Sequence, residues 1–242
     1  MKLIVLAYLL STFFSSVHAK TYTVGLVDWP PFAYVDNQSI RGISVEIVQE
    51  VSKRTGITIK IVEFPWARLM VLLEGGKVDG IAFVAKNKER ERYILYPEEP
   101  YYTLTTVFYV RKGDRDQVQT YNDLYRLGVG VVRGSEYFDP FNNDPKITKT
   151  EVVKEIQLLQ MLDKGRVGVI VGTHPQVEAQ IAQHGFTEKF EQAVYHPGND
   201  AQIYFGLSRK SALASYESRI TEAIRAMKKD GLIQKISKKY LK

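Results

Sequence analysis

The chain has 242 residues, of which 45% are apolar, 25% charged and 12% aromatic, and it contains no cysteine. This composition is typical of a globular protein and excludes collagen-like, coiled-coil and disordered chains. The absence of cysteine excludes disulfide scaffolds, thiol nucleophiles, thiolate zinc sites, iron–sulfur clusters and a lipid anchor on an N-terminal cysteine. The formal net charge is +6. Because the charges are mixed along the chain, we interpret it as solubility with some attraction for small anions.

The first 19 residues predict a secretory signal peptide. Lys2 supplies a positive start, residues 3–10 an apolar stretch, and Val17-His18-Ala19 small residues at a cleavage position. A membrane anchor needs about 20 apolar residues, but serine and threonine interrupt this run from position 11 onward. We therefore expect cleavage after Ala19 and export to the periplasm.

Short β-branched or aromatic runs alternate with amphipathic helices along the rest of the chain. The predicted strands are 21–28, 58–63, 80–84, 105–111, 128–133, 167–171 and 203–208. The predicted helices have apolar stripes at 43–51, 69–73, 156–162, 220–227 and 233–240. This alternation predicts an α/β architecture with mostly parallel sheets. Since no long linker or internal repeat divides the chain, any lobes must be connected by crossing strands.

Nucleophilic and metal chemistry have little support. After removal of the signal peptide the histidines are His174, His184 and His196, and the first two are ten residues apart. That spacing does not match the i, i+4 pattern that puts two metal ligands on one helical face. No Gly-x-Ser-x-Gly elbow, P-loop or dinucleotide fingerprint is present. We expect no metal, no cofactor and no catalytic residue.

Two aromatic segments follow the first two predicted strands. The segment 28–34 stands at a strand's carboxyl end, where open α/β sheets bind ligands, and its paired prolines stiffen a turn that can present Trp29. The segment 64–68 repeats this design with a proline, Trp66 and Arg68. Trp29 and Trp66 could equally be core residues, and Arg68 could pair with a surface acid.

Arg90 and the turn near Ser135 are candidates for binding an anion. The planar guanidinium of Arg90 can donate two parallel hydrogen bonds to a carboxylate, although by itself it could be a solvated surface residue. The segment 129–136 predicts a strand, a glycine turn and a helix start capped by Ser135. Free backbone N–H groups and the helix dipole suit an anion there; an ordinary N-cap is the alternative.

Taken together, these segments resemble the bacterial extracellular solute-binding proteins of family 3, the amino-acid-type receptors that serve ABC importers. The matching segments are WPPFAYVDNQSIRGISVEI (29–47), PWARLMVLLEGGKVDGI (65–81), KERERYILYPEEPYY (88–102), NDLYRLGVGVVRGSEY (122–137), LLQMLDKGRVGVIV (158–171), FGLSRKS (205–211) and DGLIQKISKKYL (230–241). The resemblance implies a two-lobed, type II periplasmic-binding-protein (Venus-flytrap) fold with mixed, mostly parallel sheets. Residues 20–103 and 204–242 would form lobe 1 and residues 104–203 lobe 2. Ligand binding in the cleft would close the hinge.

The resemblance also implies which residues bind the ligand. The family's stacking aromatic residue corresponds to Trp29, and a second cleft tryptophan, thirteen residues before Asp79, corresponds to Trp66. The arginine that grips the ligand carboxylate corresponds to Arg90. The Gly-Ser or Gly-Thr turn that completes this clamp corresponds to Ser135.

Several positions depart from the family pattern. The threonine three residues before the arginine is Asn87. The small hydroxyl positions that follow Asp79 are Phe83, Val84 and Ala85. The aspartate that usually holds the ligand ammonium falls on Thr173. We keep Ala85 and Thr173 as ligand-binding positions. The carboxylate half of the site is retained and the ammonium half altered, with Asp28 or Glu136 as candidate substitutes.

We therefore expect a monomeric, non-catalytic periplasmic receptor that captures a small carboxylate-bearing solute and delivers it to an ABC permease in the inner membrane. An amino acid is the leading ligand class. One alternative is a cyclohexadienyl-dehydratase-like enzyme on the same fold, with Glu46, Glu136 or His174 as general acid. Another is a receptor that presents its closed form to a sensor kinase or chemoreceptor. A nucleic-acid-binding protein is least favoured, because no clustered Lys/Arg stripe is present.

Overall fold

The computed structural model describes residues 20–36 and 39–241, so the predicted signal peptide (1–19) lies outside the described residues. The strands are β1 (Thr21–Leu26), β2 (Tyr34–Val35), β3 (Ile40–Arg41), β4 (Thr58–Glu63), β5 (Gly80–Ala85), β6 (Ile94–Leu95), β7 (Tyr102–Arg111), β8 (Val129–Val132), β9 (Lys149–Val152), β10 (Val169–His174), β11 (Phe190–Gln192) and β12 (Asp200–Ser208). The α-helices are α1 (Ile43–Thr55), α2 (Trp66–Glu74), α3 (Glu155–Asp163), α4 (Gln176–Gln183), α5 (Glu217–Lys229) and α6 (Leu232–Tyr240). No helix within the described ranges has the length and apolar character needed to span a membrane.

The main sheet is mixed and continues through both halves of the molecule. Its strand order is β4-β1-β5-β12-β7-β10-β8-β9, with β6 paired to β12 and β11 paired to β7. The ladders β4–β1–β5 and β10–β8–β9 are parallel, as expected for strands joined by crossover helices. The ladders that involve β7 or β12 are antiparallel. The predicted α/β class with a mixed sheet is confirmed.

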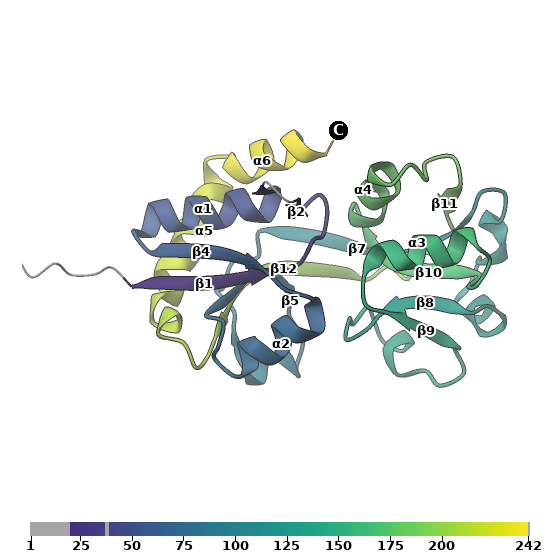
Figure 1. Cartoon of the computed structure of the whole chain (residues 1–242), viewed down its shortest axis with the longest axis horizontal. Helices are drawn as coiled ribbons and strands as arrows, with labels where there is room; N and C mark the ends of the chain where they lie inside the picture. Colours follow the sequence, from purple (N-terminus) through teal and green to yellow (C-terminus); the bar gives the residue numbers. More distant parts are fainter. Residues whose placement is uncertain (1–19, 37–38, 242) are drawn as a thin grey trace, which may run out of the picture.

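Strands β7 and β12 run from one half of the molecule into the other (Figure 1). We call the half that contains β1, β4–β6, α1, α2, α5 and α6 the first lobe, and the half that contains β8–β11, α3 and α4 the second lobe. The two crossing strands pair with each other through Thr103 and Gln202 and through Leu104 and Ala201. The lobe boundaries expected at 103/104 and 203/204 fall inside these continuous strands and stay predictions.

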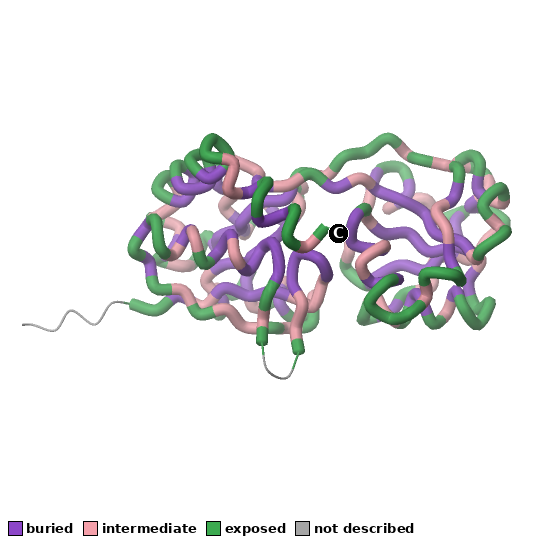
Figure 2. Tube along the Cα trace, turned by 90° about the horizontal axis from the view of Figure 1, so that it is seen from above, coloured by how far each residue is buried: buried purple, intermediate pink, exposed green. Residues whose placement is uncertain are grey.

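Each lobe has its own apolar interior, and Figure 2 shows buried segments inside both halves, with exposed ones around them. In the first lobe, α1 buries a stripe that includes Ile47 and Val51 and ends at Gly56, whose φ of 70° is a left-handed conformation favoured by glycine. In the second lobe, α3 buries Leu158 and Leu162. Full burial of such a side chain contributes about 1.5–3 kcal/mol, so each lobe carries enough apolar packing to hold its share of the cleft in place.

The region after β8 differs from the prediction. Between Val132 and Phe141, all of which the structure describes, the chain forms no helix, so Ser135 is not a helix cap. The Ser135 backbone N–H instead donates to the Val132 carbonyl at 3.1 Å and closes a turn. Pro140 stands where the helix would continue, and a proline disfavours the α conformation of the residue before it. Strands β2, β3, β6, β9 and β11 and helix α4 were not predicted.

Candidate functional site

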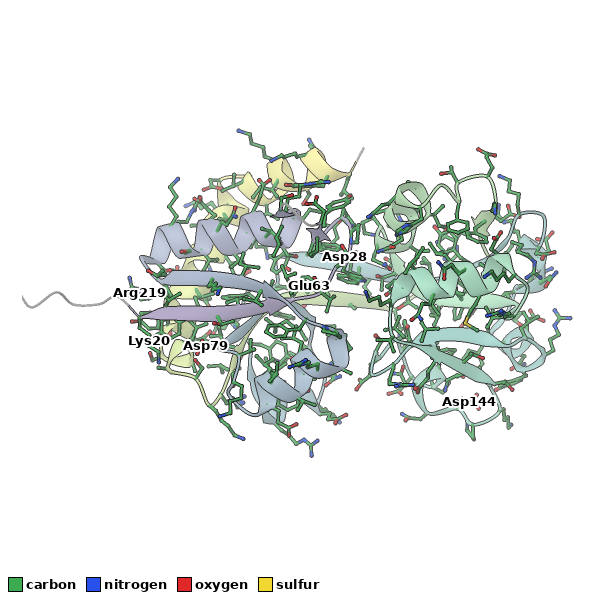
Figure 3. All side chains as sticks on the ribbon, in the orientation of Figure 1. Lys20, Asp28, Glu63, Asp79, Asp144 and Arg219 are labelled. Carbon is green, nitrogen blue, oxygen red and sulfur yellow. The ribbon has the colours of Figure 1, made fainter. Side chains whose placement is uncertain are left out.

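A cleft of about 520 Å³ lies between the two lobes. This volume is within the range of about 300–1,000 Å³ that small-molecule sites occupy. Its walls come from the ends of β1, β4 and β5 in the first lobe, and from the turn after β8, the start of α3, the end of β10 and part of α4 in the second. Figure 3 shows Asp28 and Glu63 at the end of the first-lobe sheet that faces the second lobe, with Asp79 at the opposite end.

Most of the positions indicated by the sequence meet at this cleft. Of the predicted ligand-binding positions, those that line it are Asp28, Trp29, Trp66, Ala85, Arg90, Ser135 and Thr173. Arg68 does not line it, because this side chain is exposed on α2 while its neighbour Leu69 takes the buried face of the helix.

The three candidate general acids of the dehydratase alternative also differ in whether they line the cleft. Glu136 lines the cleft. Glu46 lies outside it and accepts hydrogen bonds from Lys239 and Tyr240 of α6. His174 also lies outside it, exposed and paired with Glu178 at 2.8 Å. Two of the three acids are therefore not placed to act on a bound molecule.

Arg90 is the most tightly held charged side chain of the first-lobe wall and is only 6% exposed. Its backbone N–H donates to Asn87 Oδ1 at 2.7 Å, which fixes the turn that carries it. Its Nη1 donates to the Ala85 carbonyl at 3.2 Å, and its guanidinium lies 5.1 Å from the centre of the Trp66 ring. Arg90 forms no ion pair with any residue that the structure describes. Because a buried cation without a counter-charge is costly, this wall suits an anion.

The two lobes touch at the carbonyl of Gly134, in the turn after β8. Trp66 Nε1 donates to this oxygen at 3.0 Å and Arg90 Nη2 at 3.4 Å. Gly134 has a φ of 72°, a left-handed conformation that turns the chain sharply. The next residue, Ser135, has its backbone N–H committed to Val132, and its hydroxyl hydrogen-bonds to Tyr137. The Ser135 backbone N–H is therefore not free for an anion, and anion binding by the N–H groups near Ser135 stays a prediction.

Trp29 presents a rigid aromatic face to the cleft. Its ring stacks on Phe32 and on Phe83, with 5.0 Å between ring centres in both pairs. The turn that carries it is closed by hydrogen bonds in both directions between the backbones of Trp29 and Ala33, at 2.8 and 3.0 Å. A ring held in this way contributes contact area to a ligand at little cost in conformational entropy.

Glu155 is a cleft residue that no motif indicated. It is the first residue of α3, half-buried, and its burial raises the pKa of its carboxyl from 4.5 to about 7. The Trp29 indole and the Gln176 amide approach the carboxyl and partly oppose this rise, but neither polar atom of the Gln176 amide makes a hydrogen bond of good geometry. A sequence signal existed: Glu155 shares the helical face of Leu158 and Leu162, a carboxyl on an apolar stripe.

Thr173 and Gln180 complete the polar part of the second-lobe wall. Thr173 lies at the end of β10 and Gln180 on α4, and both line the cleft. Thr173 Oγ1 and Gln180 Oε1 are buried and have no hydrogen-bond partner within the part of the chain that the structure describes. Burial removes these two oxygens from water, and no donor among the described residues replaces the lost hydrogen bonds.

Asp28 is a cleft carboxylate with partners of its own. Its Oδ1 accepts a hydrogen bond from the Val35 backbone N–H at 3.0 Å. Burial raises the pKa of Asp28, while the Val35 hydrogen bond and the nearby His184 and Lys154 lower it. Across residues 20–36 and 39–241, no group of three or more histidine, aspartate or glutamate side chains is placed to hold a metal ion.

The sequence matches the bacterial extracellular solute-binding proteins of family 3 over residues 22–242. One similar protein is the probable amino-acid-binding protein YxeM of Bacillus subtilis, 28% identical over 218 residues, or 87% of this chain and 79% of that protein. Another is the L-cystine-binding protein TcyJ of the same organism, 26% identical over 235 residues, or 92% and 84%.

Solved structures show the same fold. A mutant of ArgBP from T. maritima superposes with a TM-score of 0.80 at 24% identity, covering 91% of this chain and 94% of that chain. AbpA from Streptococcus pneumoniae, bound to L-arginine, superposes with a TM-score of 0.80 at 20% identity and the same coverage. Together with the family match, which extends from the first strand to the end of the chain, these findings show that the chain belongs to the bacterial extracellular solute-binding proteins of family 3.

Proposed function

We propose that this chain is a periplasmic receptor that captures an amino acid between its two lobes and delivers it to an ABC permease in the inner membrane. The observation that carries the proposal is Arg90, a buried guanidinium that faces the cleft without an ionic partner among the described residues. A guanidinium matches the geometry of a carboxylate through two parallel hydrogen bonds. The solute's carboxylate would supply the missing negative charge.

The rest of the first-lobe wall supports a small organic solute. Trp29 lines the same cleft with an aromatic ring, and the Trp66 ring lies 5.1 Å from the Arg90 guanidinium. Closure of the lobes excludes water, which strengthens hydrogen bonds to charged groups. Each such bond contributes about 1.5–3 kcal/mol net, so a few of them account for tight capture.

The relatives support the amino-acid class and the transport role. The YxeM and TcyJ proteins are described as binding proteins for an amino acid and for L-cystine. The PatH protein of Vibrio harveyi, 24% identical over 219 residues, is described as a putative amino-acid ABC transporter-binding protein. Since the relatives differ in solute, the amino acid that this chain binds has to be found by experiment.

The test is a thermal-shift screen of residues 20–242 against the common L-amino acids, L-cystine and small organic acids. A solute at a hundredfold its dissociation constant adds about 2.7 kcal/mol of stability, which raises the melting temperature visibly. We expect one or a few amino acids to do so. The absence of any shift with amino acids, together with a shift from another carboxylate, would replace the amino-acid class by that carboxylate.

Two further measurements distinguish a receptor from an enzyme, and a transport role from a signalling role. A receptor returns its solute chemically unchanged after prolonged incubation, which mass spectrometry checks; a dehydratase would convert a cyclohexadienyl substrate. Deletion of the gene should abolish uptake of the radiolabelled solute. Normal uptake with a lost chemotactic or transcriptional response would favour the signalling role.

A further inference from the structure

The second-lobe wall of the cleft contains a carboxyl group that lacks a positive partner. Glu155 forms no ion pair with any residue that the structure describes, although it lines the cleft. Its polar neighbours are the Trp29 indole and the Gln176 amide, both uncharged. Burial without a cation raises the pKa of the Glu155 carboxyl to about 7. A cation arriving in the cleft would find the counter-charge there.

Glu155 fits this role better than the other acids of the cleft. Asp28 already accepts the Val35 N–H, and the nearby Lys154 and His184 lower its pKa. Glu136 is exposed, so water solvates its charge. Glu155 is half-buried at the beginning of a helix and lies against an aromatic ring.

Two acceptors without partners belong to the same wall. Helix α3, which begins at Glu155, packs against both β10 and α4, the elements that carry Thr173 and Gln180. Thr173 Oγ1 and Gln180 Oε1 are buried without a hydrogen-bond partner among the described residues, and Gln180 is only 3% exposed. A protonated amine has up to three N–H donors. Small side-chain rotations would let a donor entering from the cleft reach these oxygens, which removes the cost of leaving them unpaired.

We propose that Glu155, together with Thr173 and Gln180 on the same wall, forms a subsite for a protonated amine of the bound solute. The inference rests on the proposed function and narrows it: the solute carries both a carboxylate for Arg90 and an amine for Glu155. Thr173 contributes a hydroxyl and no charge, so the negative charge of this half of the site comes from α3 and not from the end of β10. When the lobes close, the carboxylate of the solute contacts Arg90 on the first-lobe wall and its amine contacts Glu155 on the second-lobe wall.

The experiment is a coupling measurement by isothermal titration calorimetry. The wild type and Glu155→Gln are titrated with the amino acid that gives the largest thermal shift, and with its des-amino carboxylic acid. We expect Glu155→Gln to weaken binding of the amino acid by about 30-fold or more, the effect of removing one partner of a buried charge pair. The des-amino acid should bind both proteins within about threefold, because it has no amine for Glu155 to pair with.

Glu151→Gln is the matched control. Glu151 is exposed on β9, pairs with Arg133 at 3.0 Å and does not line the cleft, so the same change of charge there should leave both affinities unchanged. Binding of the des-amino acid also reports that the Glu155→Gln protein is folded. The solute's Nα-acetyl derivative distinguishes an α-ammonium from a side-chain amine. Loss of the Glu155 dependence on acetylation assigns the α-ammonium, and its persistence assigns the side chain.

The outcomes separate the two proposals. If the wild type binds no amino acid, the proposed function fails and the amine subsite fails with it. If the wild type binds an amino acid and Glu155→Gln binds it equally well, only the amine subsite fails. An equal loss for the amino acid and its des-amino acid would show that Glu155 shapes the cleft without pairing with an amine.

Discussion

The two walls of the cleft differ in how their polar groups are held. In the first-lobe wall, Arg90 is fixed by backbone carbonyls and by the Trp66 ring, and the Trp29 ring stacks on Phe32 and on Phe83. In the second-lobe wall, Glu155 lacks a cation, and the Thr173 and Gln180 oxygens lack donors among the described residues. A preorganised wall binds at low entropic cost, whereas an unsatisfied one gains partners only when the solute arrives. The first wall is therefore suited to selecting a carboxylate and the second to stabilising the closed, loaded form.

The largest expected effect is at the preorganised wall. The substitution Arg90→Ala removes the positive partner of the solute carboxylate, so binding of the amino acid should weaken by about 2–5 kcal/mol. Calorimetric titration of the amino acid measures it. Arg68→Ala, an exposed change on α2 outside the cleft, is the control and should bind as the wild type does. Unchanged affinity in Arg90→Ala would remove this residue from the site.

The next effect concerns how the free energy of unfolding of the solute-free protein depends on pH. The folded-state pKa of Glu155 is about 7, above its ordinary value of 4.5, so between these pH values the folded protein keeps a proton that the unfolded chain has lost. This contribution to stability is therefore complete below about pH 4.5 and is lost as the pH rises through 7, by up to about 3 kcal/mol.

Glu155→Gln should flatten this dependence, because the amide does not titrate. Urea unfolding of both solute-free proteins at about pH 5 and about pH 8 measures the difference. Every other ionisable group is the same in the two proteins, so its contribution cancels in the comparison. An equal loss of stability in wild type and variant would assign the pH dependence to those other groups.

A smaller effect is expected where the two walls meet. Gly134→Ala forces an L-residue into a left-handed conformation and should destabilise the protein by about 1–2 kcal/mol. Gly128→Ala is the control, because Gly128 has no positive φ and an added methyl group there meets nothing within 4 Å. Equal unfolding free energies for the two variants would contradict the strain at Gly134.

The smallest effect is at the unsatisfied wall. Thr173→Val keeps the shape of the side chain and removes a buried hydroxyl without a partner, so the solute-free protein should become more stable by about 1 kcal/mol. Affinity for the amino acid should fall severalfold in the same variant, because one acceptor for the amine is lost. A variant that is less stable when empty would mean that this hydroxyl has a partner in solution.

The local pattern of the sequence was sufficient to predict much of the fold. The stripes of α1, α3 and α5 and the β-branched runs of β1, β4 and β8 are regular over enough residues to show their period. Strands β2, β6 and β11 are only two or three residues long, too short for a period to be visible. The helix expected at Ser135 was wrong, because Pro140 disfavours the α conformation of the residue before it, although Phe138 and Phe141 are buried as an apolar stripe would be.

The candidate site likewise contains residues that the sequence pattern indicated and one that it did not. Trp29, Trp66 and Arg90 stand in segments with a family pattern, and all three line the cleft. Glu155 stands in no such pattern, and only the packing of the two lobes shows that its carboxyl approaches the Trp29 indole. A carboxyl on the apolar face of a helix is a local signal that could have indicated it.

The acceptor that joins the lobes belongs to the peptide backbone, and this limits how firmly an empty receptor stays shut. The Gly134 oxygen takes one donor from an indole and one from a guanidinium, and both donors return to water when the hinge opens. The indole bond is worth about 0.5–1.5 kcal/mol net and the bond from the charged guanidinium about 1.5–3 kcal/mol, so together they hold the shut form about 30- to 2,000-fold in excess. Spontaneous opening is then frequent enough to admit a solute without a separate trigger.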